Sequence, residues 1–565
     1  MLSMRAVLLL AAAAVIAVVV AALLVLRGEG PGAKAPGRAE RRFFVRLFYE
    51  GCRGSPLLYS DPLMRRNFFK RGEVAAFEID VSNPEDRDLK VAFFIAPADD
   101  PSRLTRVHEG VARAGSVTRF SFEVDTSQLP PALYLLLAEV EGRGRFGSNT
   151  DPFRSTNLES YPWLLAVLDE PVRWEAPGEG LPRLIVPEGL GVNIHFVAPS
   201  PLEERDLDMI AYAGFKLVRM DLFWHLVERE RGSYDLSGYR ALTEALRRRG
   251  VRPLYILDYG NPLYDDGLPP RSEEGRSAFA RFAGRAAEEF GAYALWEVWN
   301  EPNIAVFWKP QPNVGDYVKL AAAAAAAVKG ACPSCTVLAP ATSGVDVSFI
   351  SSAASLGLLD RVDAVSVHPY RDSNPETALG DYERLRAVVK GKAIVCSEWG
   401  YPTAGGYGSR VDVWRQAQYA ARIYLVNLMA GVPITIIYDW KDDGLSLEDS
   451  EQNFGLVSHH VRGPEWFFVK PAWYALYNLN RLLAGLSPAE RLDLGAGAYA
   501  LRFEGRGAPK IVVWTDGSER EVELNVGAEK VRLVRLFGLE EELEAPGGVL
   551  KLRVSGSPVV AEPLG

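Results

Sequence analysis

The stretch Trp296-Glu297-Val298-Trp299-Asn300-Glu301-Pro302-Asn303 begins as a buried strand and ends abruptly in Asn-Glu-Pro. A second segment, Ser397-Glu398-Trp399-Gly400, repeats this arrangement further along the chain. Each segment predicts a strand with a glutamate at its C-terminal end. Two such carboxyl groups are what acid–base chemistry on a glycosidic bond requires, because one protonates the leaving oxygen while the other attacks the sugar or activates water.

Short apolar strands alternate with amphipathic or alanine-rich helices around this stretch, a pattern typical of a parallel sheet with helical crossovers. Eight strand–helix units within about 300 residues predict a (β/α)8 TIM barrel. The strands are expected at residues 190–196, 217–222, 253–259, 294–299, 337–341, 364–367, 393–397 and 434–440. Helices are expected at residues 237–249, 273–290, 314–328, 375–389 and 411–429.

Runs that alternate with a period of two flank the barrel sequence on both sides. Residues 43–178 predict a β-sandwich-like domain, residues 179–485 the catalytic barrel, and residues 486–565 a C-terminal β-sandwich domain. Before them, residues 28–42 are rich in Gly, Pro and Ala and predict a linker.

The N-terminus predicts a membrane anchor. Residues 6–26 are apolar without interruption, and as a helix they extend ~31 Å, enough to cross the hydrocarbon core of a bilayer. The run is too long for a cleaved signal segment, so residues 1–27 are interpreted as a single-pass transmembrane helix. The basic residues after it favour a cytoplasmic body. The expected chemistry outweighs them, because polymeric glycans lie outside the cell, so we expect an extracellular catalytic part.

The charge composition of the chain argues against a nucleic-acid partner. The 565 residues carry 63 basic and 72 acidic side chains, a net charge of −9, without a basic stripe that would indicate nucleic acid. A neutral sugar carries no charge that the protein has to complement, so the acidic composition is compatible with a glycan substrate.

Cys332 and Cys335 form a close pair, which we interpret as a loop staple or as two spare thiols. Cys396 is interpreted as a small core side chain. The sequence leaves the oligomeric state open.

Strands four and seven lie roughly across a barrel from each other, so Glu301 and Glu398 are expected to face a common cleft at its C-terminal end. The alternative is a pair of structural carboxylates. Strand parity places Glu297 on the interior face as well, and a buried charge needs a partner. Arg219 on strand two is the candidate, since alternate strands contribute to one interior layer.

The strand-end motifs resemble the clan A glycoside hydrolases. Within that clan, the chain is most similar to the β-xylosidase and iduronidase family, family 39, and to family 5 cellulase-like proteins. The resemblance covers the whole barrel. Besides the two glutamate segments, the matching motifs are Gly191-Val-Asn-Ile-His195-Phe, Val218-Arg219-Met-Asp, His368-Pro-Tyr370 and Tyr438-Asp-Trp440.

The resemblance implies a retaining mechanism in which Glu301 is the general acid/base and Glu398 is the nucleophile. It also implies that Arg219 and Tyr370 donate hydrogen bonds to Glu398, and that Asn300 binds the sugar 2-hydroxyl. Trp440 is expected as the floor on which a sugar ring stacks, with a core role as the alternative. The full set of residues expected to bind substrate is Asn300, Arg219, His195, Trp224, His368, Tyr370 and Trp440.

The mechanism needs no cofactor, and the sequence contains no metal-ligand spacing or dinucleotide fingerprint that would predict one. A second functional hypothesis is a barrel without turnover that binds glycans at the cell surface, and a third is an inverting hydrolase or transglycosylase on the same site. The identity of the sugar stays open. The loops at residues 261–267 and 441–452 are expected to distinguish sugars.

Overall fold

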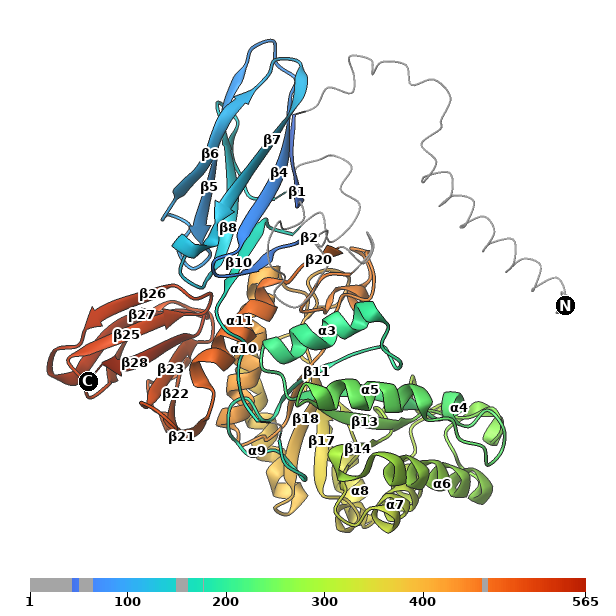
Figure 1. The fold of residues 1–565 in the computed structure, drawn as a ribbon. Helices are drawn as coiled ribbons and strands as arrows, with labels where there is room; N and C mark the ends of the chain where they lie inside the picture. Colours follow the sequence, from blue (N-terminus) through green and yellow to red (C-terminus); the bar gives the residue numbers. More distant parts are fainter. Residues whose placement is uncertain (1–42, 50–64, 149–160, 176, 460–465, 565) are drawn as a thin grey trace, which may run out of the picture.

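The computed structural model describes residues 43–49, 65–148, 161–175, 177–459 and 466–564. A β-rich domain, a barrel and a second β-rich domain follow one another along the chain (Figure 1). The predicted membrane anchor and linker, residues 1–27 and 28–42, lie outside the described residues. None of the helices in the described part combines the length and apolar character that a bilayer crossing requires.

The central domain is a closed barrel of eight parallel strands, which confirms the predicted fold class. The hydrogen-bonded order is β15-β14-β13-β12-β11-β19-β18-β17, and a further pairing between β15 and β17 closes the ring. The strands are β11 (Leu190–Asn193), β12 (Leu217–Phe223), β13 (Arg252–Asp258), β14 (Leu295–Val298), β15 (Thr336–Leu338), β17 (Ala364–His368), β18 (Ala393–Trp399) and β19 (Thr435–Ile437).

Helices cover the outside of this barrel and begin at recognisable caps. Helix α6 (Glu273–Phe290) begins after Ser272, whose side chain accepts a hydrogen bond from the Gly275 amide. Helix α10 (Val413–Met429) begins after Asp412, which caps two amides of its first turn. The other long barrel helices are α3 (Pro201–Tyr212), α5 (Ser237–Arg248), α7 (Val314–Ala331), α8 (Val347–Ser355), α9 (Ala378–Val389) and α11 (Pro471–Leu483).

Two sheets form the N-terminal domain and enclose an apolar core. Phe77, Phe93 and Phe122 are buried in that core, and their rings contact one another. One sheet contains β1 (Phe44–Tyr49), β4 (Val74–Asn83) and β7 (Ser116–Asp125). The other contains β3 (Phe68–Lys70), β10 (Leu164–Leu168), β8 (Leu133–Val140), β5 (Leu89–Pro97), β6 (Thr105–Ala112) and β9 (Gly144–Phe146).

The C-terminal domain repeats this architecture on a smaller scale. Val522 and Leu524 on β24 are buried while Glu521 and Glu523 are exposed, as the alternation predicted. Its larger sheet contains β21 (Leu486–Leu492), β22 (Ala498–Gly505), β23 (Lys510–Thr515), β28 (Val559–Leu564), β25 (Lys530–Arg535) and β26 (Glu540–Glu544). The strands β24 (Arg520–Asn525) and β27 (Val549–Val554) form the second sheet.

The structure shows the roles of three cysteines. Cys332 and Cys335 are joined by a disulfide just after α7, so this pair is a loop staple rather than two spare thiols. Cys396 on β18 is free and buried in the barrel core.

The two β-domains contact each other through Asp99. This carboxylate accepts hydrogen bonds from the backbone amides of Phe537, at 3.0 Å, and Leu539, at 3.2 Å. Burial at the interface raises the pKa of Asp99 from 3.8 to about 7, although both amides and Arg535 favour the charged form.

This raised pKa predicts a pH-dependent interface. The folded protein keeps the Asp99 proton between pH 3.8 and about 7 while the unfolded chain releases it, so this group makes the free energy of unfolding fall as the pH rises through that window. In Asp99→Asn this contribution to the slope should be absent. Denaturant unfolding of both proteins at several pH values is the measurement, with Asp100→Asn as the control because its carboxylate lies at the surface. Parallel pH profiles of wild type and Asp99→Asn would contradict the assignment.

Candidate active site

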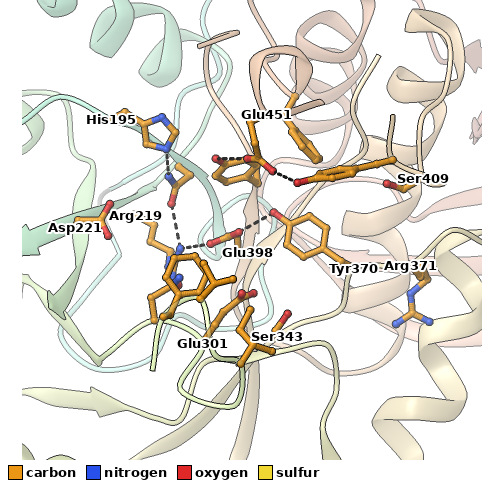
Figure 2. A pocket seen from close by; sticks show the side chains of 18 of the residues that line it. His195, Arg219, Asp221, Glu301, Ser343, Tyr370, Arg371, Glu398, Ser409 and Glu451 are labelled. Carbon is orange, nitrogen blue, oxygen red and sulfur yellow. Dashed lines mark hydrogen bonds and ion pairs between the residues drawn. The ribbon is translucent and has the colours of Figure 1, made fainter. Parts of the chain in front are cut away.

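A pocket of about 850 Å³ lies at the C-terminal ends of the barrel strands. Both candidate glutamates line it (Figure 2). Of the other residues expected to bind substrate, the pocket brings together Asn300, Arg219, His195 and Tyr370. His368 does not line the pocket but touches Glu301 from behind, through a 2.8 Å contact.

The turn after β14 directs Glu301 into this pocket. Strand β14 ends at Val298, and both Trp299 and Glu301 adopt left-handed backbone conformations, with φ values of 67° and 44°. Such conformations are unfavourable for these residue types and persist only where the surroundings hold them. Here the Glu301 amide donates to the Ala341 carbonyl, and the Trp299 indole donates to the Phe307 carbonyl. Packing and hydrogen bonds therefore fix the position of the glutamate.

The guanidinium of Arg219 connects its own strand, β12, to β11, β14, β17 and β18. It is 1% exposed, and its Nε donates to Glu297 Oε2 at 2.8 Å, which confirms the predicted pairing. Its Nη2 donates to Asn300 Oδ1 at 2.7 Å, and its Nη1 donates to Glu398 and to Asn193 Oδ1. Its Nη2 also lies 3.4 Å from Nε2 of His368, and because arginine has donors only, every one of these partners must present a hydrogen-bond acceptor to it.

Glu398 is held as a carboxylate from two sides. Arg219 donates to Oε2, and the Tyr370 hydroxyl donates to Oε1 at 2.8 Å (Figure 2). Burial raises the pKa of Glu398, but the charges of His368 and Arg219 and the hydrogen bond from Tyr370 outweigh it, so the pKa lies below the ordinary value. The site therefore keeps this glutamate ionised.

Glu301 has a different environment. Its Oε1 lies 2.8 Å from Nδ1 of His368, a fully buried histidine whose Nε2 lies 3.1 Å from the Ser397 hydroxyl. A carboxylate oxygen of Glu301 and one of Glu398 lie within 4.8 Å of each other. The two carboxyl groups are therefore adjacent, with an arginine and a tyrosine on one and a histidine on the other.

His195 lies at the edge of the pocket with its ring partly exposed. Its Nδ1 lies 2.9 Å from Asp443 Oδ1, and its Nε2 lies 3.0 Å from the Asn193 amide. Partial desolvation lowers the pKa of His195, but Asp443 and Asp439 outweigh this effect and raise the pKa to about 9. The two carboxylates therefore favour a proton on Nδ1, while the Asn193 side-chain NH2, which can only donate, favours an unprotonated Nε2.

Within the part of the chain that the structure describes, two clusters each place three potential metal ligands within 4.8 Å of one another, namely His195, Asp439 and Asp443, and Glu301, His368 and Glu398. In each cluster the histidine is already paired with a carboxylate, at 2.9 and 2.8 Å respectively. These contacts account for both groupings without an ion.

The structure corrects the prediction for two tryptophans. Trp224 is fully buried, stacks on Tyr264 and donates its indole N–H to Glu228, so it belongs to the core. Trp440 is 1% exposed and donates to Asp206 of α3, so it does not form the floor of the large pocket. Strand β19 already ends at Ile437, and the alternation of side chains therefore does not extend to Trp440.

Sequence reasoning missed Tyr438 as the aromatic residue that lines the pocket in this region. Its hydroxyl donates to Glu451 Oε2 at 3.4 Å, and Tyr407 donates to Oε1 of the same glutamate at 2.8 Å. Glu451 belongs to the 441–452 loop, where sugar-distinguishing residues were expected. No residue of the other expected loop, 261–267, is among the described residues that line the pocket. The Tyr438-Asp-Trp440 motif was the signal for Tyr438, but it offered two aromatic candidates.

The Arg219–Glu297 pair predicts a large stability effect. Glu297 is fully buried, so Glu297→Gln leaves part of the Arg219 charge uncompensated and should lower the free energy of unfolding by about 3 kcal/mol. Thermal or denaturant unfolding is the measurement. Glu504→Gln is the matched control, since the Glu504–Arg502 pair lies at the surface and should contribute less than about 1 kcal/mol. An unchanged melting temperature in Glu297→Gln would refute the role of the pair.

Comparison with solved structures finds the same fold elsewhere. A family 39 glycoside hydrolase from the gut symbiont Bacteroides cellulosilyticus WH2 aligns with a TM-score of 0.64 and 22% identity, over 86% of this chain and 96% of that chain. A family 39 β-xylosidase from Caulobacter crescentus aligns with a TM-score of 0.50 and 19% identity, over 69% and 99%. The family 39 enzyme from Xanthomonas axonopodis pv. citri aligns with a TM-score of 0.50 and 18% identity, over 68% and 96%.

No protein-family profile and no curated protein match the sequence itself. At these identities the likeness establishes the fold. The resemblance to family 39 that the strand-end motifs indicated is therefore confirmed at the level of the fold.

Proposed function

We propose that the chain is a retaining glycoside hydrolase that cleaves β-linked sugars, with Glu301 as the general acid/base and Glu398 as the nucleophile. The observation that carries the proposal is the pair of adjacent carboxyl groups with unequal surroundings. Environments that separate two carboxyl groups in this way are typical of sites that need one acid and one charged base or nucleophile.

The reaction follows from these two environments. The Glu398 carboxylate attacks the anomeric carbon while Glu301 gives its proton to the leaving oxygen, which breaks the glycosidic bond and forms a glycosyl ester on Glu398. Glu301, now ionised, then removes a proton from water. The water oxygen attacks the anomeric carbon, releases Glu398 and completes a double displacement with retained configuration.

The separation of the carboxyl groups favours retention over inversion. Retaining enzymes hold the two groups ~5–5.5 Å apart, whereas inverting enzymes need ~6.5–9.5 Å to admit a water molecule between carboxylate and sugar. One oxygen of each carboxyl group lies within 4.8 Å of the other, in keeping with the shorter arrangement. We therefore propose retention, which an inverted product would contradict.

Two further residues complete the sugar site. The Asn300 carbonyl oxygen accepts from Arg219, which turns its amide nitrogen towards other partners and leaves it available for the sugar 2-hydroxyl. Tyr438 takes the stacking role expected of Trp440, because its ring lines the pocket and Glu451 fixes its hydroxyl.

The charges of the pocket favour a neutral sugar. Among the described lining residues, the guanidinium of Arg219 is used by Glu297 and Glu398, and that of Arg371 pairs with Asp381 at 3.0 Å. His195 is balanced by Asp443. A uronic acid would need an uncommitted cation, so neutral substrates are preferred, and the name β-xylosidase of the Caulobacter relative makes xylosides the first to try.

The principal test is a screen of residues 43–565 against aryl β-glycosides and β-linked oligosaccharides. Wild type should turn over a neutral glycoside, and Glu398→Gln should abolish turnover because the attacking carboxylate is lost. Glu301→Gln should reduce kcat/KM by about 10²–10⁴-fold, least for substrates with acidic leaving groups that need no proton, and should lower kcat for every substrate because hydrolysis of the glycosyl ester loses its base. NMR of the first-formed product should show the retained anomer.

Glu504→Gln serves as the matched control and should retain full activity. Wild-type protein that binds glycans without cleaving any would instead favour the alternative, a glycan-binding barrel without turnover. An inverted first product would contradict the double displacement, while transfer to a sugar acceptor that outcompetes hydrolysis in water would indicate a transglycosylase on the same site.

We also propose that residues 1–27 anchor the chain in the membrane, with the catalytic part outside the cell. The uninterrupted apolar run at residues 6–26 supports the anchor, and the Cys332–Cys335 disulfide is typical of an oxidising compartment.

Membrane fractionation of cells that express the full chain should place it in the membrane fraction. Protease added to intact cells, or to spheroplasts if an outer envelope blocks access, should digest the catalytic part. Recovery in the soluble cytosolic fraction would contradict the anchor. Protection until the cells are lysed would contradict the orientation.

A further inference from the structure

The loop that follows β17, residues 369–377, joins the pocket to the C-terminal domain. Its first part lines the pocket with Tyr370, Arg371 and Asp372. Its second part carries Asn374 and Glu376, which contact residues of β23 and of the turn after it. The wall of the pocket is therefore attached to a domain that supplies no residue to the described pocket lining.

The first attachment is at Asn374. Its side-chain amide donates to the backbone carbonyl of Asp516, in the turn between β23 and β24, while its Oδ1 accepts from the Tyr419 hydroxyl on α10 at 2.5 Å. Asn374 thus links a barrel helix to the C-terminal domain. Both polar ends of its side chain are in use.

The second attachment is at Glu376, which is 5% exposed. Arg422 of α10 is fully buried and donates to both carboxylate oxygens, with 2.7 Å between its Nε and Oε1. The indole N–H of Trp514, on β23, donates to Oε1 at 2.7 Å. The C-terminal domain thereby shields an ion pair in the barrel wall and supplies one of its hydrogen bonds, which matters because a buried ion pair is stable only when its remaining hydrogen-bonding capacity is satisfied.

The remaining loop contacts come from the barrel. The Tyr401 hydroxyl donates to the Ser373 carbonyl at 2.6 Å, and Arg371 pairs with Asp381. Both contacts lie between Tyr370 and the two attachments to the C-terminal domain. The loop on which Tyr370 lies is therefore contacted by both domains.

We propose that the C-terminal β-domain positions the pocket wall, because Trp514 and Asp516 hold the 369–377 loop where Tyr370 can donate its hydrogen bond to Glu398. This inference rests on the proposed function for its catalytic consequence. It assigns Trp514 and Asn374 as positioning residues, which act through Tyr370 and do not touch the substrate.

A displaced 369–377 loop is expected to affect Glu398, the proposed nucleophile. Tyr370 donates to Glu398 and is one of the groups that lower the pKa of Glu398. If the loop moves and this hydrogen bond weakens, the carboxylate loses stabilisation and its pKa rises. The acid limb of kcat/KM, which reports an essential base of the free enzyme, then moves to higher pH.

The test uses Trp514→Phe in the chain from residue 43 onward, with Asn374→Ala as a second variant. Phenylalanine keeps an aromatic ring beside Tyr499 but removes the N–H that binds Glu376. Each variant should lower kcat/KM by about three- to tenfold through misplacement of Tyr370 and move the acid limb to higher pH, in the same direction as Tyr370→Phe.

A double-mutant comparison tests whether Trp514 acts through Tyr370. Tyr370→Phe/Trp514→Phe should lose little more activity than Tyr370→Phe alone, because Tyr370→Phe already removes the hydrogen bond to Glu398 through which Trp514 is proposed to act. Additive losses, or a loss without movement of the acid limb, would overturn the positioning role. Glu541→Gln is the matched control: away from the 369–377 loop it breaks contacts to Arg103 of the N-terminal domain and Arg535 of the C-terminal domain, and it should leave activity and the acid limb unchanged.

Hydrogen exchange separates this inference from the proposed function. Amides of residues 369–377 should exchange faster in Trp514→Phe and Asn374→Ala than in wild type or Glu541→Gln. Faster exchange in a protein that turns over no glycoside would support the attachment and refute the proposed function. Unchanged exchange in an active enzyme would refute the attachment alone.

Discussion

The buried guanidinium of Arg219 is the interaction on which the active-site end of the barrel depends. From β12 it reaches Glu297 and Asn300 at the end of β14, Asn193 on β11 and Glu398 on β18. Such a charge is tolerated in the interior only because its donors meet oxygens, including two carboxylates. The same contacts that compensate the charge also fix the orientation of the groups proposed to act on the sugar.

This arrangement separates the roles of two chemically identical side chains. Glu398 receives donors from Arg219 and Tyr370 and has a lowered pKa, whereas Glu301 is held by His368 on a backbone with a left-handed conformation. Geometry and hydrogen bonding together create the asymmetry that acid–base catalysis needs. The C-terminal domain extends the support outward, since its contacts with the 369–377 loop bear on Tyr370.

Much of the fold was predictable because local patterns and tertiary structure agree there. A strand buried on both faces and a helix with an apolar stripe each leave a periodic signal, so the eight strands and five of the helices between them were placed within a few residues, whereas α3 and α8 were not predicted. Parity along β14 even identified Glu297 as an interior charge and Arg219 as its partner. The flanking β-domains were predictable from alternation alone, as Val522 and Leu524 on β24 illustrate.

The sequence by itself determined which carboxyl groups stand at strand ends, because strand length and parity are local properties. The tertiary structure decided which aromatic residue faces the pocket. Tyr438 does and Trp440 does not, because β19 stops at Ile437 and the chain leaves the alternating conformation. It also decided that Trp514, more than a hundred residues after the 369–377 loop, lies against that loop. Contacts between domains depend on how separately folded surfaces meet, and no periodicity along the chain encodes that.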